Sequence, residues 1–303
     1  MSSELFTVEV ETQGAFAGIA TLVLDAPGKP VVVLDHALIT RLECTLKSLP
    51  AGLRGLVLAS SSERAFVAGA DLKSIQEMND AQLHDYLRLG SRVFGMLAQL
   101  PFPTAAAING AALGGGLELA MHCDGLIGAP PPMRDGQPGK PYPVGLPEAG
   151  LGICPGWGGT SLFAARIDPA DAIRRTASGS PLIFDDCVKA GLFDAVAPDA
   201  SSLRLTAKSW VARHIQGSRS RDGAPLIHAG RADKAAGVVR AIDAVRNEVS
   251  ASDAGRAVLA AIDAGVLHGW AACLEVEQRE LVRLRSTPHA KELIAAFFAK
   301  SKK

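Results

Sequence analysis

Two glutamates beside glycine or proline turns are the residues of this chain best suited to acid–base chemistry. Glu118 follows the glycine run Gly114–Gly116 by two residues, and Glu148 follows Pro147 directly. A third segment, Ala65–Lys73, lies upstream of both and is rich in small residues. A buried carboxylate is costly unless it is paired or used. These segments therefore offer two groups that can move protons and two loops whose backbone N–H groups can face a ligand.

The glycine run before Glu118 has a structural and a functional interpretation. Gly114–Gly116 could simply allow a tight corner between a strand and a helix. Alternatively, an N–H at the helix start, aided by the helix dipole, binds a developing negative charge beside Glu118 in the first helical turn. We favour this second interpretation because two such features share one turn. A dinucleotide-binding turn does not fit, because the G-x-G-x-x-G spacing and the acidic residue about twenty positions onward are both missing.

Other candidates have simpler explanations. Taken alone, Glu148 could be a surface carboxylate after a turn. His122 lies four residues after Glu118, and we interpret it as a satisfied histidine rather than a catalytic partner. The glycine run Pro155–Thr160 lacks the lysine of a phosphate-binding loop, so we expect a turn that packs beneath Glu148. Cys154 has no histidine near it in sequence, which argues against a nucleophile.

Composition narrows the class of protein. The chain has 303 residues, with 31 basic and 31 acidic side chains, and this balance does not favour nucleic acid as a partner. The start Met1–Glu4 lacks the pattern of a secretion signal, and no apolar stretch reaches membrane-spanning length. Five scattered cysteines form no C-x-x-C pair. We therefore expect a reduced, cytoplasmic protein without a metal site and without a membrane partner.

Strand and helix signals alternate over the first two hundred residues, which predicts an α/β fold with mainly parallel pairing. The expected strands are Phe6–Glu11, Ile19–Asp25, Gly55–Ser60 and Thr104–Asn109. The expected helices run from an Asp35 cap to Leu49, from Asp80 to Leu100, and from the glycine turn to Cys123. Ser60–Gly69 is expected to be a mostly polar loop.

The remaining segments are a proline-rich stretch and a helical tail. Pro130–Pro143 contains six prolines and is predicted to be an irregular loop. After Ser201 the chain is rich in alanine, charged residues and helical spacing, which predicts several helices with a loop at Ser218–Gly223. Several apolar residues of this tail are expected on helix faces: Trp210, Ala257–Ile262, and Leu281 and Val282 with Leu284.

Taken in order, these motifs resemble the crotonase (enoyl-CoA hydratase/isomerase) superfamily. Ala65–Lys73 looks like its acyl-CoA loop, Ile108–Ala120 like its helix-entry motif, and Leu146–Glu148 with Pro155–Thr160 like its second carboxylate segment. Ala190–Val196 is similar to a later family motif, so the resemblance covers about residues 5–200. It implies a spiral of ββα turns over residues 1–200 for acyl-CoA binding and catalysis. It also implies a helical region over residues 201–303 for packing and assembly as a homotrimer or a dimer of trimers.

The resemblance also assigns roles to residues. The N–H groups of Ala70 and Gly115 would form an oxyanion hole for a thioester carbonyl. Glu118 would orient and deprotonate water for attack at C3, and Glu148 would protonate C2. The substrate and its coenzyme A portion would contact Ala68, Ala70, Asp71, Leu72, Lys73 and Gly115. Coenzyme A would be part of the substrate, with no permanently bound cofactor.

The expected activity is a trans-2-enoyl-CoA hydratase of fatty-acid β-oxidation, with a 3-hydroxyacyl-CoA dehydrogenase as a partner. The alternatives are an enoyl-CoA delta-isomerase, another acyl-CoA reaction (hydrolase or C–C lyase), and a non-catalytic acyl-CoA-binding scaffold. Because an isomerase can work with one carboxylate, the presence of both Glu118 and Glu148 favours hydration. The chain departs from the family at Val32, where asparagine is common, and in the length of Pro130–Pro143. That loop could narrow the acyl pocket, cover the site or mediate assembly.

Overall fold

The computed structural model describes residues 5–216 and 232–301, which form two compact units. The first unit combines residues 5–69, 92–144 and 182–216. The second combines residues 70–91, 145–181 and 232–301. The predicted loop at Ser218–Gly223 lies outside the described residues. Among those residues, no helix combines the length and the apolar character needed to span a membrane.

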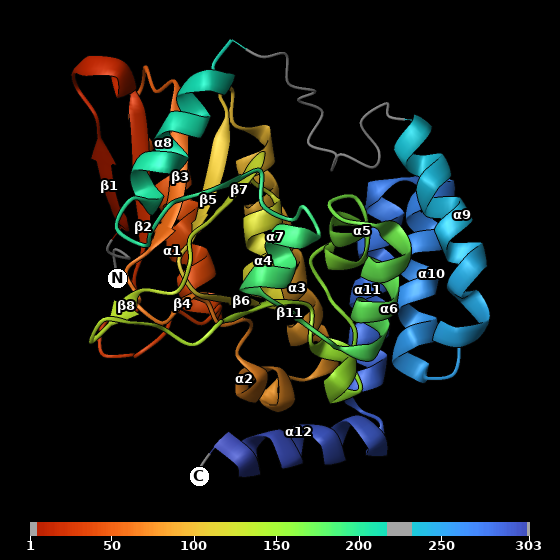
Figure 1. Cartoon of the computed structure of the whole chain (residues 1–303). Coiled ribbons are helices and arrows are strands. Elements are labelled where there is room, and N and C mark those ends of the chain that lie inside the picture. Colours follow the sequence, from red (N-terminus) through yellow and green to blue (C-terminus); the bar gives the residue numbers. More distant parts are fainter. Residues whose placement is uncertain (1–4, 217–231, 302–303) are drawn as a thin grey trace. The chain divides into compact units, whose positions relative to one another are not determined.

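The first unit is built on a six-stranded sheet in the order β1-β2-β3-β5-β7-β12 (Figure 1). Its strands are β1 (Thr7–Val10), β2 (Ile19–Leu24), β3 (Gly55–Ser60), β5 (Thr104–Ile108), β7 (Gly125–Gly128) and β12 (Ala195–Val196). β1 pairs with β2 antiparallel, and the other neighbours are parallel. Every residue of β2, β3 and β5 is buried, as expected for parallel strands covered on both faces. These strands confirm the α/β prediction.

Helix α8 (Leu203–His214) packs on this sheet. Trp210 and Val211 join a core that includes Ile19, Val57 and Ala105. A Cβ atom at Gly55 would lie 2.2 Å from a methyl carbon of Val211, so glycine lets the helix approach the strand closely. The prediction that Trp210 belongs to an apolar helix face is confirmed.

A second, four-stranded sheet in the same unit has the order β11-β10-β6-β4. Its strands are β4 (Ala65–Val67), β6 (Ala111–Leu113), β10 (Pro143–Gly145) and β11 (Leu182–Ile183). Besides α8, the helices of this unit are η1 (Gly14–Phe16), α1 (His36–Lys47), α4 (Gly115–Met121), α7 (Phe184–Lys189) and the C-terminal part of α3 (Asp80–Gln99). The Asp35 cap of α1 is confirmed, because its carboxylate accepts a hydrogen bond from the Leu38 N–H at 2.8 Å.

The chain order strand–strand–helix occurs three times, as β1-β2-α1, β3-β4-α2 (Leu72–Glu77) and, after α3, β5-β6-α4. The prediction of one continuous loop over Ser60–Gly69 is wrong, since β4 lies within it. Both β4 and β6 are three residues long, too short to show a strand period in the sequence.

The prediction that Pro130–Pro143 is wholly irregular is also wrong. Strands β8 (Met133–Arg134) and β9 (Gln137–Pro138) pair antiparallel as a small hairpin. Asp135 and Gly136 connect them with φ angles of +50° and +74°. Positive φ at both turn positions suits the right-handed twist of a two-residue hairpin, and Asp-Gly is a strong signal for it.

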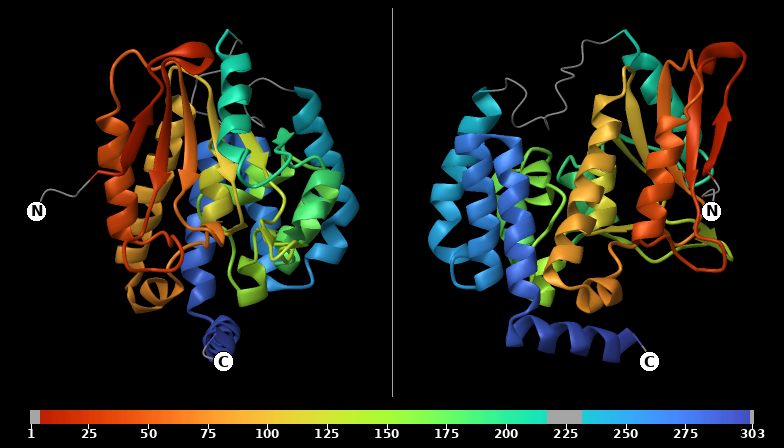
Figure 2. Two further views of the ribbon diagram at one scale, coloured as in Figure 1. Left: turned by 60° about the vertical axis from the view of Figure 1, so that its left-hand side comes forward. Right: turned by 180° about the vertical axis from the view of Figure 1, so that it is seen from behind.

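The second unit is helical. It contains α2 (Leu72–Glu77), the N-terminal part of α3, η2 (Glu148–Leu151), α5 (Gly159–Ala164), α6 (Pro169–Ser178), α9 (Ala232–Val249), α10 (Asp253–His268), α11 (Trp270–Arg285) and α12 (Pro288–Ser301). Figure 2 shows α9, α10 and α11, in blue, running beside one another. After Ser201 the described residues form helices without a strand, as predicted, and Ala257, Ile262 and Leu281 are buried.

Candidate active site

Glu118 lies in the first turn of α4, a helix whose residues are all buried. The helix begins after Gly114, which has a φ of +52° and whose carbonyl accepts the Glu118 N–H at 3.0 Å. A Cβ atom at Gly116 would lie 2.2 Å from the Val67 carbonyl oxygen. Gly114 and Gly116 therefore have the structural role of a tight corner. Gly115 is the first helical residue, and its N–H has no intrahelical partner by the geometry of a helix start.

The Glu118 side chain is held inside the first unit, with the residue 1% exposed. His122, one turn further on, is also buried, and its Nδ1 lies 2.8 Å from the Glu118 carbonyl oxygen. The ring packs edge-on against Phe94 at 5.8 Å between centroids. These contacts confirm that His122 is a satisfied core histidine.

The segment after β4 runs beside the strand that leads into α4. Ala68 donates its N–H to the Val32 carbonyl at 2.9 Å, so this backbone donor is already used. Gly69 accepts the Leu34 N–H at 2.9 Å, and a Cβ atom at Gly69 would lie 3.1 Å from the Leu113 carbonyl oxygen. The Val32 carbonyl and the Leu34 N–H thus hold this segment by backbone hydrogen bonds, which need no asparagine side chain at position 32.

The next predicted site residues belong to the second unit and form the start of α2. The Asp71 carboxylate accepts the Lys73 N–H at 3.1 Å and the Ser74 hydroxyl at 2.7 Å, so it is the N-cap of this helix. Leu72 and Lys73 are its first two residues, and not part of a loop as expected. The Lys73 ammonium is exposed and lies 3.9 Å from Glu77. Ala70, between Gly69 and this cap, is half-buried.

Glu148 is the first residue of η2 and is half-buried, but its Oε2 atom is fully buried and has no hydrogen-bond partner. Burial raises the pKa of Glu148 to about 8, and the negative charge of Glu277 adds to the increase. Such a group keeps its proton at neutral pH, as a general acid must. Gly115 and Glu118 lie in the first unit, and Glu148 lies in the second.

Glu277 of α11 is a buried carboxylate whose charge acts on Glu148, and the sequence did not single it out. It is 0% exposed, and its carboxylate accepts hydrogen bonds from the backbone of the Pro155–Thr160 glycine run. Burial raises its pKa to about 7, although these hydrogen bonds act to lower it. The available signal was its spacing, since Cys273, Glu277 and Leu281 recur every fourth residue on one buried helix face.

Cys154 is buried, and its thiol donates to the Glu277 backbone carbonyl at 3.5 Å. A structural thiol accounts for this residue, in agreement with our argument against a nucleophile. Across residues 5–216 and 232–301, no cluster of three or more His, Cys, Asp or Glu side chains could hold a metal ion.

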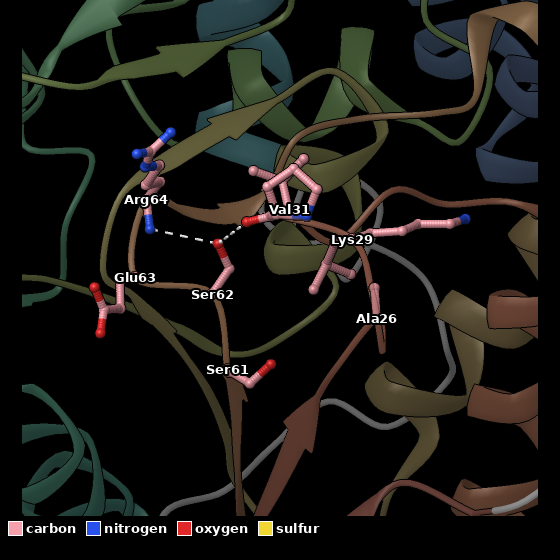
Figure 3. Close-up of a pocket in the computed structure, with 9 residues that line it drawn as sticks. Ala26, Lys29, Val31, Ser61, Ser62, Glu63 and Arg64 are labelled. Atoms are coloured by element: carbon pink, nitrogen blue, oxygen red, sulfur yellow. Dashed lines mark hydrogen bonds between the residues drawn. The ribbon is translucent and has the colours of Figure 1, made fainter.

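A cavity of about 410 Å³ opens on the first unit (Figure 3). Lys29 and Arg64 contribute cationic groups to its lining, and Ser61 and Ser62 contribute hydroxyls. The Ser62 hydroxyl accepts the Arg64 N–H at 3.4 Å and donates to the Pro30 carbonyl at 3.2 Å. Glu63 also lines the cavity, and Lys29 is paired with Asp35 at 3.1 Å, so the lining combines charges of both signs with hydrogen-bonding groups.

Comparison with known proteins gives a family match over most of the chain. The family model for enoyl-CoA hydratase/isomerase matches residues 14–221. This range includes Glu118, Glu148 and the Ala65–Lys73 segment. Because the match covers more than half of the chain, it confirms the resemblance inferred from the motifs.

Solved structures agree with that match. An enoyl-CoA hydratase from Bacillus anthracis is 26% identical, with a TM-score of 0.61, covering 98% of this chain and 97% of that chain. An enoyl-CoA hydratase from Bacillus halodurans is 18% identical, with a TM-score of 0.66, covering 97% of this chain and 100% of that chain. DspI from Pseudomonas aeruginosa is 23% identical, with a TM-score of 0.60, covering 99% of this chain and 97% of that chain. Because their identity is below 25%, the last two matches show similarity of the fold alone. The predicted crotonase-like fold with a helical C-terminal region is confirmed.

Proposed function

The chain belongs to the enoyl-CoA hydratase/isomerase family, and we propose that it is a trans-2-enoyl-CoA hydratase. The product would be a 3-hydroxyacyl-CoA thioester. The observation that carries this proposal is the pair of glutamates, Glu118 buried in α4 and Glu148 with a pKa raised to about 8. Hydration needs one group that takes a proton from water and another that gives a proton to carbon.

In the proposed mechanism, both glutamates act on one bound thioester. Ionised Glu118 orients a water molecule and removes its proton as the oxygen attacks C3. Electron density then moves to the thioester carbonyl, and the backbone N–H groups of Ala70 and Gly115 stabilise the enolate oxygen. The enolate collapses as Glu148 gives its proton to C2. The proton taken by Glu118 returns Glu148 to its acid form through solvent, so that each turnover consumes one water.

We propose that the 410 Å³ cavity beside Lys29 and Arg64 binds phosphate groups of coenzyme A. The guanidinium of Arg64 and the hydroxyls of Ser61 and Ser62 support this assignment, whereas Lys29 is already paired with Asp35. The predicted binding residues Ala68, Ala70, Asp71, Leu72 and Lys73 would contact the rest of the cofactor portion. Asp71 would do so through the helix that it caps, since its carboxylate is already used.

By analogy with its family, the chain would assemble as a homotrimer or a dimer of trimers. A 3-hydroxyacyl-CoA dehydrogenase is the proposed partner, because that class of enzyme consumes the product of hydration. No resident cofactor is required, since addition of water leaves the oxidation state of the whole molecule unchanged.

The test is to mix the purified protein with crotonyl-CoA and longer trans-2-enoyl-CoA thioesters and to follow the absorbance of the conjugated thioester. We expect the absorbance to fall and mass spectrometry to find the thioester plus one water. Saturated butyryl-CoA serves as the unreactive control. Conversion of 3-enoyl-CoA to 2-enoyl-CoA without hydration would indicate the isomerase instead. Tight thioester binding without turnover at any chain length would indicate a non-catalytic scaffold.

A further inference from the structure

Glu277 is a buried carboxylate of the second unit for which the proposed reaction has no direct use. One oxygen, Oε2, accepts the Gly158 N–H at 2.6 Å. The other, Oε1, accepts the Thr160 N–H at 3.0 Å and the Thr160 hydroxyl at 2.5 Å. Three donors aimed at one carboxylate stabilise its ionised form. Burial still raises the pKa of Glu277, but these donors make it the carboxyl of the pair whose charge is better stabilised.

Glu148 has fewer donors than Glu277. Its buried Oε2 atom receives no hydrogen bond, and the one hydrogen bond that acts to lower its pKa comes from its own backbone. Two consecutive residues connect it with Glu277: the Ile153 N–H donates to the Glu148 carbonyl at 3.1 Å, and the Cys154 thiol donates to the Glu277 carbonyl at 3.5 Å. Because of these contrasting surroundings, the first proton lost by the pair leaves Glu277.

Other ionisable groups on the helices around this pair are mostly exposed or ion-paired. The ion pairs are Asp85–Arg88 on α3, Asp171–Arg175 on α6, Arg174–Glu248, Arg246–Asp263, Asp253–Arg256 on α10, Arg283–Glu280 on α11 and Arg285–Asp80. The exposed groups include Glu275, His268, His289, Lys291 and Glu292; His84 and Arg166 are half-buried, and the thiols of Cys154 and Cys273 are buried. The charge of Glu277 is the one that acts on Glu148 in the buried surroundings that the two glutamates share.

We propose that Glu277 is a positioning residue for proton delivery: it carries the negative charge of the buried Glu148–Glu277 pair and so keeps the proton on Glu148. The inference rests on the proposed function for the fate of that proton, which passes from the Glu148 oxygen to C2. Glu277 itself gains and loses no proton during turnover. It also fixes the Gly158–Thr160 backbone, which follows η2 in the chain.

The direct test is a pH titration of glutamate carboxyl carbons by ¹³C NMR in the full-length protein. The proteins compared are the wild type, Glu277→Gln, Glu148→Gln and the control Glu275→Gln, which removes an exposed carboxylate from the same helix. In Glu277→Gln we expect the Glu148 signal to titrate roughly one pH unit lower, while Glu275→Gln leaves it unmoved. A Glu148 titration that is the same with and without Glu277 overturns the proposal.

A second variant covers the case in which Glu277→Gln does not fold. Thr160→Val removes the hydroxyl donor to Glu277 and leaves the Thr160 N–H bond in place. The Glu277 signal should then titrate at higher pH than in the wild type, because its ionised form has lost one stabilising hydrogen bond. An unmoved Glu277 signal would show that these donors do not hold a charge there.

Turnover provides the second readout. The alkaline limb of kcat/KM for crotonyl-CoA hydration should move in Glu277→Gln by the same amount as the Glu148 titration. If the alkaline limb moves down by one pH unit, kcat/KM at a pH on that limb becomes about tenfold lower in Glu277→Gln than in the wild type. Near pH 6 the kcat/KM values of the two proteins should differ least. Equal loss at every pH would mean a merely structural role. If the Glu148 signal moves in a protein without hydratase activity, the proposed function fails and the coupling between the glutamates stands.

Discussion

Glu118 and Glu148, the proposed base and acid, occupy different surroundings. Glu118 lies on a buried helix whose start is fixed by Gly114 and Gly116. Glu148 lies at the start of a single short turn, with a buried oxygen that accepts no hydrogen bond. One fold can supply both a base and an acid at neutral pH when the surroundings separate the proton affinities of two carboxyls.

Replacement of either glutamate by glutamine tests these roles. Glu118→Gln and Glu148→Gln keep the shape of the side chain and remove its ability to exchange a proton. Each should lower hydratase kcat by roughly two to four powers of ten. Crotonyl-CoA binding, measured by calorimetry, should change much less and serves as the control for folding. Near-normal turnover in either variant would mean that its role is misassigned.

The site residues differ in how far sequence alone could reveal them. Glu118 and Glu148 stand beside local turn signals, so their neighbours in the chain point to them. Glu277 lies in the middle of a long helix, and its partners Gly158 and Thr160 are 119 and 117 residues away. Only tertiary structure brings such a carboxylate to its donors. In the sequence itself, its sign is a charged residue on an otherwise apolar helix face.

At the scale of elements, the start of α4 is the feature on which the proposed oxyanion hole depends. Gly115→Pro removes the N–H at the first helical position, where proline fits the backbone. Loss of one preorganised donor should lower turnover by roughly two to three powers of ten in a protein that still folds, as judged by circular dichroism. Unchanged activity in the folded variant would exclude this N–H from the reaction.

The neighbouring glycine provides a contrasting control. A Cβ atom at Gly116 would lie 2.2 Å from the Val67 carbonyl oxygen, so Gly116→Ala should destabilise the fold itself. Thermal unfolding should show a lower Tm for Gly116→Ala than for Gly115→Pro. The two substitutions thereby separate a glycine needed for close packing from one whose N–H is proposed to act on substrate.

Elements were predictable where they carry a period or a cap. The helix α1 has a helical period and follows its Asp35 cap as expected, and the buried strands β2, β3 and β5 are mostly apolar runs. Strands β4 and β6 are defined instead by parallel pairing between Ala65–Val67 and Ala111–Ala112, which leaves no local pattern. The β8–β9 hairpin did have a signal, Asp135-Gly136, which the surrounding prolines outweighed in our interpretation.

At the scale of the molecule, side chains of helix α11 form hydrogen bonds with segments of the second unit that are distant in the sequence. Glu277 holds the glycine run before α5, and Gln278 donates to the Ser91 hydroxyl of α3 at 2.9 Å. At its C-terminal end, Arg285 donates to the carbonyls of Ile75 and Met78 at the end of α2. The C-terminal helices thus form part of the surroundings of Glu148 and of α2. The predicted functional boundary near residue 200 stays a prediction.

The buried pair should also affect the stability of the whole protein. The pKa values of Glu148 and Glu277 are raised from 4.5 to about 8 and about 7, so the folded state retains protons that the unfolded state loses. This contribution is fully present below pH 4.5 and is lost as pH rises through the folded values. Hydrogen bonds from Arg92 and Lys47 lower the pKa of Glu43 to about 2, so the stability that Glu43 contributes changes with pH only below about pH 4.5.

We therefore expect the free energy of unfolding, measured by urea denaturation, to fall between pH 5 and pH 7. The limiting slope is about 1.4 kcal/mol per pH unit for each retained proton. The double variant Glu148→Gln/Glu277→Gln has no carboxyl to titrate at these positions, so its stability should depend less steeply on pH. The difference in slope between the two proteins isolates the pair from the other ionisable groups. Parallel pH dependences would mean that the two carboxyls lose their protons as readily when folded as when unfolded.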